Sequence, residues 1–79
     1  MRLENNSIEN VINEVKELDL HGVKHADVDR LVENFVLLNE PPLTIITGNS
    51  HKMEEIVIHS LLNHNINFIR WDSGVLKVL

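Results

Sequence analysis

Apolar residues in the first half of the chain recur at helical spacing, then at strand spacing, then at helical spacing again. The isoleucines and valines of NSIENVINEVKE predict a helix over residues 7–16. The segment ELDLHG then alternates apolar and polar residues, which predicts a strand over 17–21. A second helix is predicted through HADVDRLVENFVLLNE, whose apolar residues share one face, and the prolines at 41–42 end it.

The second half of the chain repeats this order and adds a hairpin. LTIIT is rich in β-branched residues and predicts a strand over 43–47. HKMEEIVIHSLLNHN carries apolar residues at helical spacing, and Asn49 or Ser50 can cap the helix that this predicts. NFIRW and VLKVL predict two short strands joined by a DSG turn.

These elements predict an α/β fold, a two-layer sandwich in which the helices cover one face of a mixed sheet. A strand, a helix and a strand of these lengths form a right-handed crossover, so the strands over 17–21 and 43–47 should be parallel. Residues 1–16 are then an accessory helix and 17–79 the domain. Trp71 fits a packing role better than a base-stacking one. The predicted core comprises Leu18, Leu20, Val28, Leu31, Phe35, Ile45, Ile56, Val57 and Leu61.

Composition and charge limit the classes of partner that the protein is expected to bind. The 79 residues include 7 Lys and Arg, 12 Asp and Glu and no Cys, for a formal net charge of −5. This balance counts against tight binding to duplex DNA, which needs clustered cations. Without Cys the chain forms neither disulfides nor thiolate metal sites. It also lacks an apolar run of about 20 residues and an apolar signal core, so a cytoplasmic location is expected.

The candidate functional residues cluster where the two predicted parallel strands end. Asp19 and His21 point to the same side of their strand because a strand alternates its faces. The loops after both strands lead into helix starts, whose free N–H groups favour an anion such as phosphate. The blander interpretation is that Asp19 and His21 form an ordinary exposed pair and that Ser50 is only a cap. The residues expected near one point are Asp19, His21, Thr47, Asn49, Ser50, His51 and Lys52.

Three motifs, LDLHG, LTIITG and the terminal SGVLKVL, together resemble the Smr (small MutS-related) domain over residues 17–79. The resemblance implies a βαβαββ fold with a four-stranded sheet in the order 1-2-4-3, whose last strand is antiparallel to the others. That fold is similar to the C-terminal domain of bacterial translation initiation factor three. The resemblance also implies nucleic-acid binding and, in some members, nicking endonuclease or ribonuclease activity.

The resemblance places roles on particular residues. Asp19 and His21 match the functional DLH motif, and Thr47 to His51 match the glycine loop of the family. Asp19 would bind Mg²⁺ or Mn²⁺ or orient the attacking water, and His21 would carry a proton or contact the phosphate. The predicted catalytic residues are Asp19, His21 and His51. The predicted substrate-binding residues are Gly22, Lys24, Thr47, Gly48, Asn49, Ser50 and Lys52.

One departure from the family keeps a second function open. The loop reads GNS where the family often has Gly-Lys-Gly or Gly-Arg-Gly. The missing basic residue and the net charge of −5 favour a catalytically inactive nucleic-acid-binding or protein-interaction module on the same fold. The expected partner of the active form is RNA or branched or nicked DNA, bound weakly because of the acidic charge.

Overall fold

A computed structural model of the chain describes residues 16–79, so the accessory helix predicted over residues 7–16 lies, except for Lys16, outside the described part. The described part has the predicted order of elements. The elements are β1 (Glu17–Asp19), α2 (His25–Leu38), β2 (Leu43–Ile46), α3 (His51–Asn63), β3 (Phe68–Asp72) and β4 (Val75–Val78).

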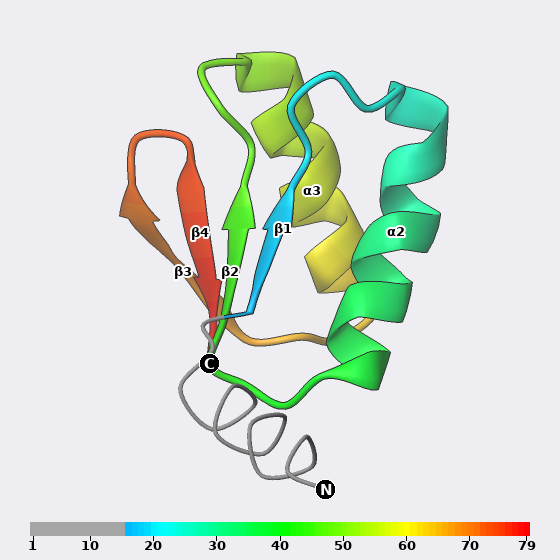
Figure 1. The fold of residues 1–79 in the computed structure, drawn as a ribbon, viewed down its shortest axis with the longest axis vertical. Coiled ribbons are helices and arrows are strands. Elements are labelled where there is room, and N and C mark those ends of the chain that lie inside the picture. The colour runs from blue at the N-terminus through cyan, green and yellow to red at the C-terminus, as the bar shows by residue number, and fades with distance from the viewer. Residues whose placement is uncertain (1–15) are drawn as a thin grey trace, which may run out of the picture.

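The four strands form one mixed sheet in the order β1-β2-β4-β3. β1 and β2 are parallel, with Leu18 opposite Ile45, and β4 is antiparallel to both β2 and β3. Both helices lie on the same side of this sheet (Figure 1). The predicted two-layer α/β fold, its strand order and its antiparallel last strand are therefore confirmed.

The core lies between the sheet and the two helices. Of the predicted core, Leu20, Val28, Ile45, Val57 and Leu61 are fully buried. Leu18, Leu31, Phe35 and Ile56 pack against this core but remain partly exposed, because they lie toward its margins. The core residues that the prediction omitted are Val32, Leu43, Met53, Leu76 and Val78.

Trp71 contradicts the packing role expected from the sequence, because 63% of its surface is exposed. The register of β3 against β4 shifts between Arg70 and Asp72, so Trp71 is the extra residue of a β-bulge. A bulge re-aims the side chain that it carries. Among the described residues, β3 is also the edge strand of the sheet, paired with β4 alone.

Candidate functional site

The loops that follow β1 and β2 lie side by side at one end of the sheet (Figure 1). The parallel pairing of the two strands continues into the first loop, where the Leu20 amide donates to the carbonyl oxygen of Ile46 over 3.0 Å. Between the loops lies a cavity of about 610 Å³, called the loop cavity below. Its polar and glycine residues are His21, Gly22, His25, Thr47, Gly48, Asn49 and Ser50.

Asp19 shapes the first loop. Its Oδ1 accepts a hydrogen bond of 2.9 Å from the backbone amide of His21. The chain then turns at Gly22, whose φ of 78° lies in the left-handed region, and the Val23 amide bonds back to Leu20 over 3.0 Å. The Asp19 carboxylate therefore fixes the turn that presents His21, and Asp19 itself is not among the residues that line the cavity.

Helix α2 begins at the loop cavity without a side-chain cap. Lys24 occupies the N-cap position in an extended conformation, and its side chain makes no capping hydrogen bond. The Asp27 amide bonds to the Lys24 carbonyl oxygen over 2.9 Å. His25, the first residue of α2, lines the cavity beside His21. His25 was not among the residues that the sequence predicted for the site, so this second imidazole was missed.

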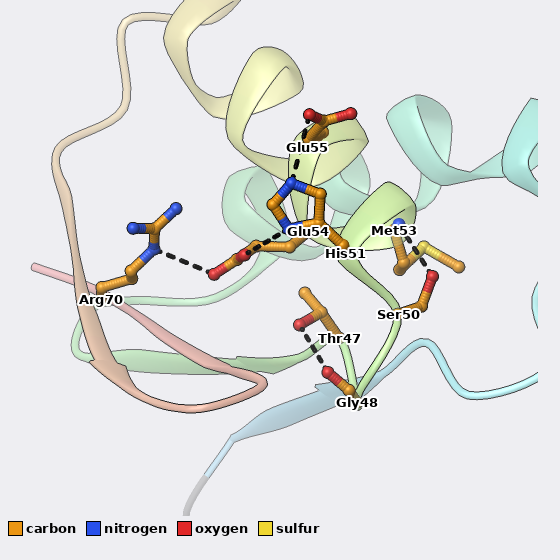
Figure 2. A network of polar contacts seen from close by, with 8 residues as sticks. All are labelled: Thr47, Gly48, Ser50, His51, Met53, Glu54, Glu55 and Arg70. Carbon is orange, nitrogen blue, oxygen red and sulfur yellow. Dashed lines mark hydrogen bonds and ion pairs between the residues drawn. The ribbon is translucent and has the colours of Figure 1, made fainter.

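The second loop is closed by Gly48 and Ser50 (Figure 2). Gly48 has a φ of 72°, and Ser50 Oγ accepts a hydrogen bond of 3.0 Å from the Met53 amide. Of the two predicted caps, Asn49 and Ser50, Ser50 is thus the N-cap of α3. The hydroxyl group of buried Thr47 points along the loop, where its Oγ1 lies 3.4 Å from the Gly48 carbonyl oxygen.

His51 and Lys52 lie apart from this cavity although the sequence grouped them with it. His51 is 80% exposed, with its Nε2 3.4 Å from Glu55 Oε2 and its Nδ1 3.9 Å from Glu54 Oε1. It lines a second depression of about 430 Å³ between the start of α3 and the β3–β4 turn, the hairpin depression. Lys52 lines a third, of about 500 Å³, formed by α3 and Asp29 of α2. Successive helical residues point about 100° apart, which explains the divergence.

The hairpin turn is joined to the second loop through backbone contacts. The Gly74 carbonyl oxygen accepts hydrogen bonds from the amides of Thr47, over 2.9 Å, and Gly48, over 3.3 Å. On β3, the strand that leads into this turn, Arg70 Nε donates to Glu54 Oε2 of α3 over 2.9 Å (Figure 2). These contacts set the hairpin depression directly beside the loop cavity, and Gly48, Asn49 and Ser50 line both.

A cluster of ionisable residues joins the two helices away from the loops. Ser60 Oγ donates to Asp29 Oδ1 over 2.6 Å, and His64 Nε2 lies 3.3 Å from the same oxygen. The hydrogen bond from Ser60, with the positive charges of His64 and His59, holds the pKa of Asp29 below its ordinary value of 3.8. His64 Nδ1 also lies 3.9 Å from Glu33 Oε2.

The residues around Asp19 do not form a cage for the metal ion that the resemblance implies. Within residues 16–79, the only three His, Asp or Glu side chains with ligand atoms close together are Asp29, Glu33 and His64. His64 directs its two ring nitrogens at different carboxylates, which is the geometry of ion pairs rather than of one shared ion. A single carboxylate at Asp19 supplies only one protein ligand, so Mg²⁺ or Mn²⁺ there remains a prediction from the resemblance.

Comparisons with protein families, with curated proteins and with solved structures return no match to this chain. Within the described residues no helix has the length and apolar character needed to cross a membrane. The predicted cytoplasmic location remains a prediction.

Proposed function

We propose that this chain is an Smr-like domain that binds the phosphodiester backbone of nucleic acid in the loop cavity. The observation that carries the proposal is the cavity of about 610 Å³ in which His21 and His25 meet the glycine loop after β2. Ligands of open α/β sheets gather at the carboxyl ends of the strands, which is where this cavity lies.

The groups that border the cavity suit an anionic oxygen. Histidine N–H groups donate hydrogen bonds to phosphate, and the N–H groups of a helix start favour negative charge. Gly22 and Gly48 leave open space, since a Cβ at either position would meet nothing within 4 Å. A phosphate can therefore approach the backbone of both loops closely.

The charge balance predicts weak rather than tight binding. Two carboxylates near the second loop already have side-chain partners, Glu54 in Arg70 and Glu55 in His51. The net charge of −5 nevertheless leaves few cations to neutralise successive phosphates. We expect few phosphate contacts, a shallow salt dependence and a preference for single strands over duplex DNA.

Fluorescence anisotropy with labelled single-stranded RNA, single-stranded DNA and duplex DNA tests the proposal. We expect the double substitution His21→Ala with His25→Ala to weaken binding at least about tenfold, since it removes two charge-assisted contacts. His59→Ala is the matched control, because His59 lines the depression on the helix layer instead. Equal binding by the double variant and the parent would contradict a phosphate site in the loop cavity.

A second candidate function is cleavage of RNA, and the pair of imidazoles in one cavity favours it. One imidazole would remove the proton of a ribose 2′-hydroxyl group, whose oxygen then attacks phosphorus. The bond from phosphorus to the next 5′-oxygen breaks, and the second imidazole, protonated, supplies that oxygen with its proton. The products would be a 2′,3′-cyclic phosphate and a 5′-hydroxyl end.

Incubation of labelled RNA with and without EDTA separates this route from the metal-assisted one. Cleavage by the imidazole pair persists in EDTA, requires a 2′-hydroxyl group and is lost in His25→Ala. Cleavage through a metal ion at Asp19 stops in EDTA and in Asp19→Asn, and also acts on DNA. Binding without cleavage supports the catalytically inactive binding module. If neither binding nor cleavage is observed, that result supports a protein-interaction module.

A further inference from the structure

Trp71, at the edge of the hairpin depression, is an exposed aromatic residue that the proposed phosphate site does not use. Trp71 is the one Trp of the chain, and 63% of its surface is exposed. The described core is built from aliphatic residues and Met53 and is complete without the indole ring. The β-bulge between Arg70 and Asp72 sets this side chain on the edge strand beside the depression of about 430 Å³.

Lys77 supports one face of the Trp71 ring. Its Nζ lies 5.4 Å from the ring centroid, within the range of a cation–π contact. The same Nζ donates to Thr44 Oγ1 over 3.1 Å, and Thr44 is only 6% exposed. The lysine is therefore held by a buried hydroxyl group, and it restrains the indole ring before any ligand arrives. A ring restrained in this way loses little entropy when a second flat group stacks on it.

The position of Trp71 relative to the loop cavity indicates which part of a bound nucleotide could reach the ring. Gly48, Asn49 and Ser50 line the loop cavity on one side and the hairpin depression on the other. A nucleotide with its phosphate in the loop cavity would extend its base across this loop toward Trp71. Bases stack on aromatic side chains irrespective of sequence, because every base has a π face.

We infer that Trp71, supported by Lys77, stacks on an unpaired base of a single-stranded nucleic acid at the edge of the hairpin depression. This inference rests on the proposed function, because the loop cavity would hold the adjoining phosphate. The ligand class is a single strand, since a base within a duplex is stacked on its neighbours and cannot reach the ring. Asn49 lines the same depression and offers hydrogen-bonding groups to the edge of the base.

The experiment compares three ligands of one length: a single-stranded RNA, the same RNA paired in a duplex, and an abasic ribose–phosphate oligomer. The readout is affinity by anisotropy together with the Trp71 indole N–H signal in NMR spectra, which is unique because the chain has one Trp. We expect Trp71→Ala to weaken the single strand about tenfold and to leave the abasic oligomer unchanged. Trp71→Phe should recover most of the affinity, and Ile69→Ala, an exposed position on the same strand, is the control.

The outcomes separate this inference from the proposed function. If the parent binds the abasic oligomer and the His21→Ala, His25→Ala variant does not, the result supports the phosphate site alone. If the abasic oligomer binds but Trp71→Ala and the parent bind the single strand equally, the stacking site is overturned while the phosphate site stands. An indole signal that moves with the single strand, but not with the duplex or the abasic oligomer, supports the stacking site. If none of the ligands binds, both proposals fail.

Discussion

Gly74 in the hairpin turn packs directly on the backbone of Gly48 in the loop after β2. A Cβ built on Gly74 would lie 2.6 Å from the Gly48 carbonyl oxygen, closer than such atoms can approach. The Gly74 carbonyl oxygen also accepts the two amide hydrogen bonds of Thr47 and Gly48. This contact holds the loop cavity and the hairpin depression in a fixed relation, so the glycine of the terminal motif SGVLKVL has a structural reason.

Gly74→Ala should therefore destabilise the protein more than an alanine at Gly48. Both glycines have a φ in the left-handed region, 75° and 72°, which costs about 1–2 kcal/mol for an alanine. Only Gly74 adds a collision with backbone atoms, worth about 1–3 kcal/mol more as the chain shifts. Urea denaturation of both variants checks this, and equal losses of stability would show that the hairpin turn moves away freely.

Ser50 combines two roles that substitutions can separate. Ser50→Ala removes the cap of α3 and should lower the free energy of unfolding by about 1 kcal/mol. Ser50→Asp keeps a capping oxygen and places a negative charge at the helix start, so stability should stay near that of the parent. The same aspartate borders the loop cavity and should weaken binding of RNA. Unchanged RNA binding in a stable Ser50→Asp protein would count against a phosphate near this loop.

The elements, the parallel pair and the hairpin could be predicted from the sequence because periodicity and chain connection determine them, whereas the strand order followed from the resemblance. The strand over 17–21 ends at Asp19 and the strand over 43–47 ends at Ile46, so only the ends of these elements differed. Asp19, His21 and the glycine loop are adjacent because parallel strands end at one edge of a sheet. His51 and Lys52 diverge because they already belong to α3, where each successive residue turns by about 100°.

The remaining features depend on details that a sequence pattern does not contain. The bulge at Trp71 is visible only in the register of β3 against β4, because one extra residue leaves the apolar pattern almost unchanged. The contact of Ser60 with Asp29 joins residues 31 positions apart on separate helices, and it depends on how α2 and α3 pack. The sequence signal that could have placed a second imidazole at the site was the position of His25 at the start of the helix that follows the first loop.

Two adjacent leucines on α3 test the core assignment directly. Leu61 is fully buried, while Leu62 is 61% exposed. Leu61→Ala should lower the free energy of unfolding by about 2–5 kcal/mol, because it removes buried methyl groups and leaves a cavity. Leu62→Ala should change it by less than about 0.5 kcal/mol. Thermal and urea denaturation compare the two, and similar effects would mean that the face of α3 against the sheet is assigned wrongly.

The hydrogen bond between Ser60 and Asp29 predicts a pH dependence of stability with a definite sign. The pKa of Asp29 lies below its ordinary value of 3.8, chiefly because Ser60 Oγ donates to the carboxylate. A lowered pKa in the folded state means that the unfolded chain takes up the proton first. The contribution of Asp29 is therefore fully present above the ordinary value and is lost as the pH falls through the lowered pKa.

Ser60→Ala should raise the pKa of Asp29 toward 3.8 and reduce this part of the acid dependence, while His64 still lies 3.3 Å from the carboxylate. NMR titration of the Asp29 carboxyl carbon measures the pKa, and urea denaturation between about pH 2 and pH 6 measures the stability, since the loss falls below the ordinary value. Ser73→Ala, in the hairpin turn, is the matched control and should leave both unchanged. An Asp29 pKa that stays low in Ser60→Ala would assign the effect to the charges of His64 and His59 instead, and His64→Ala should then raise it.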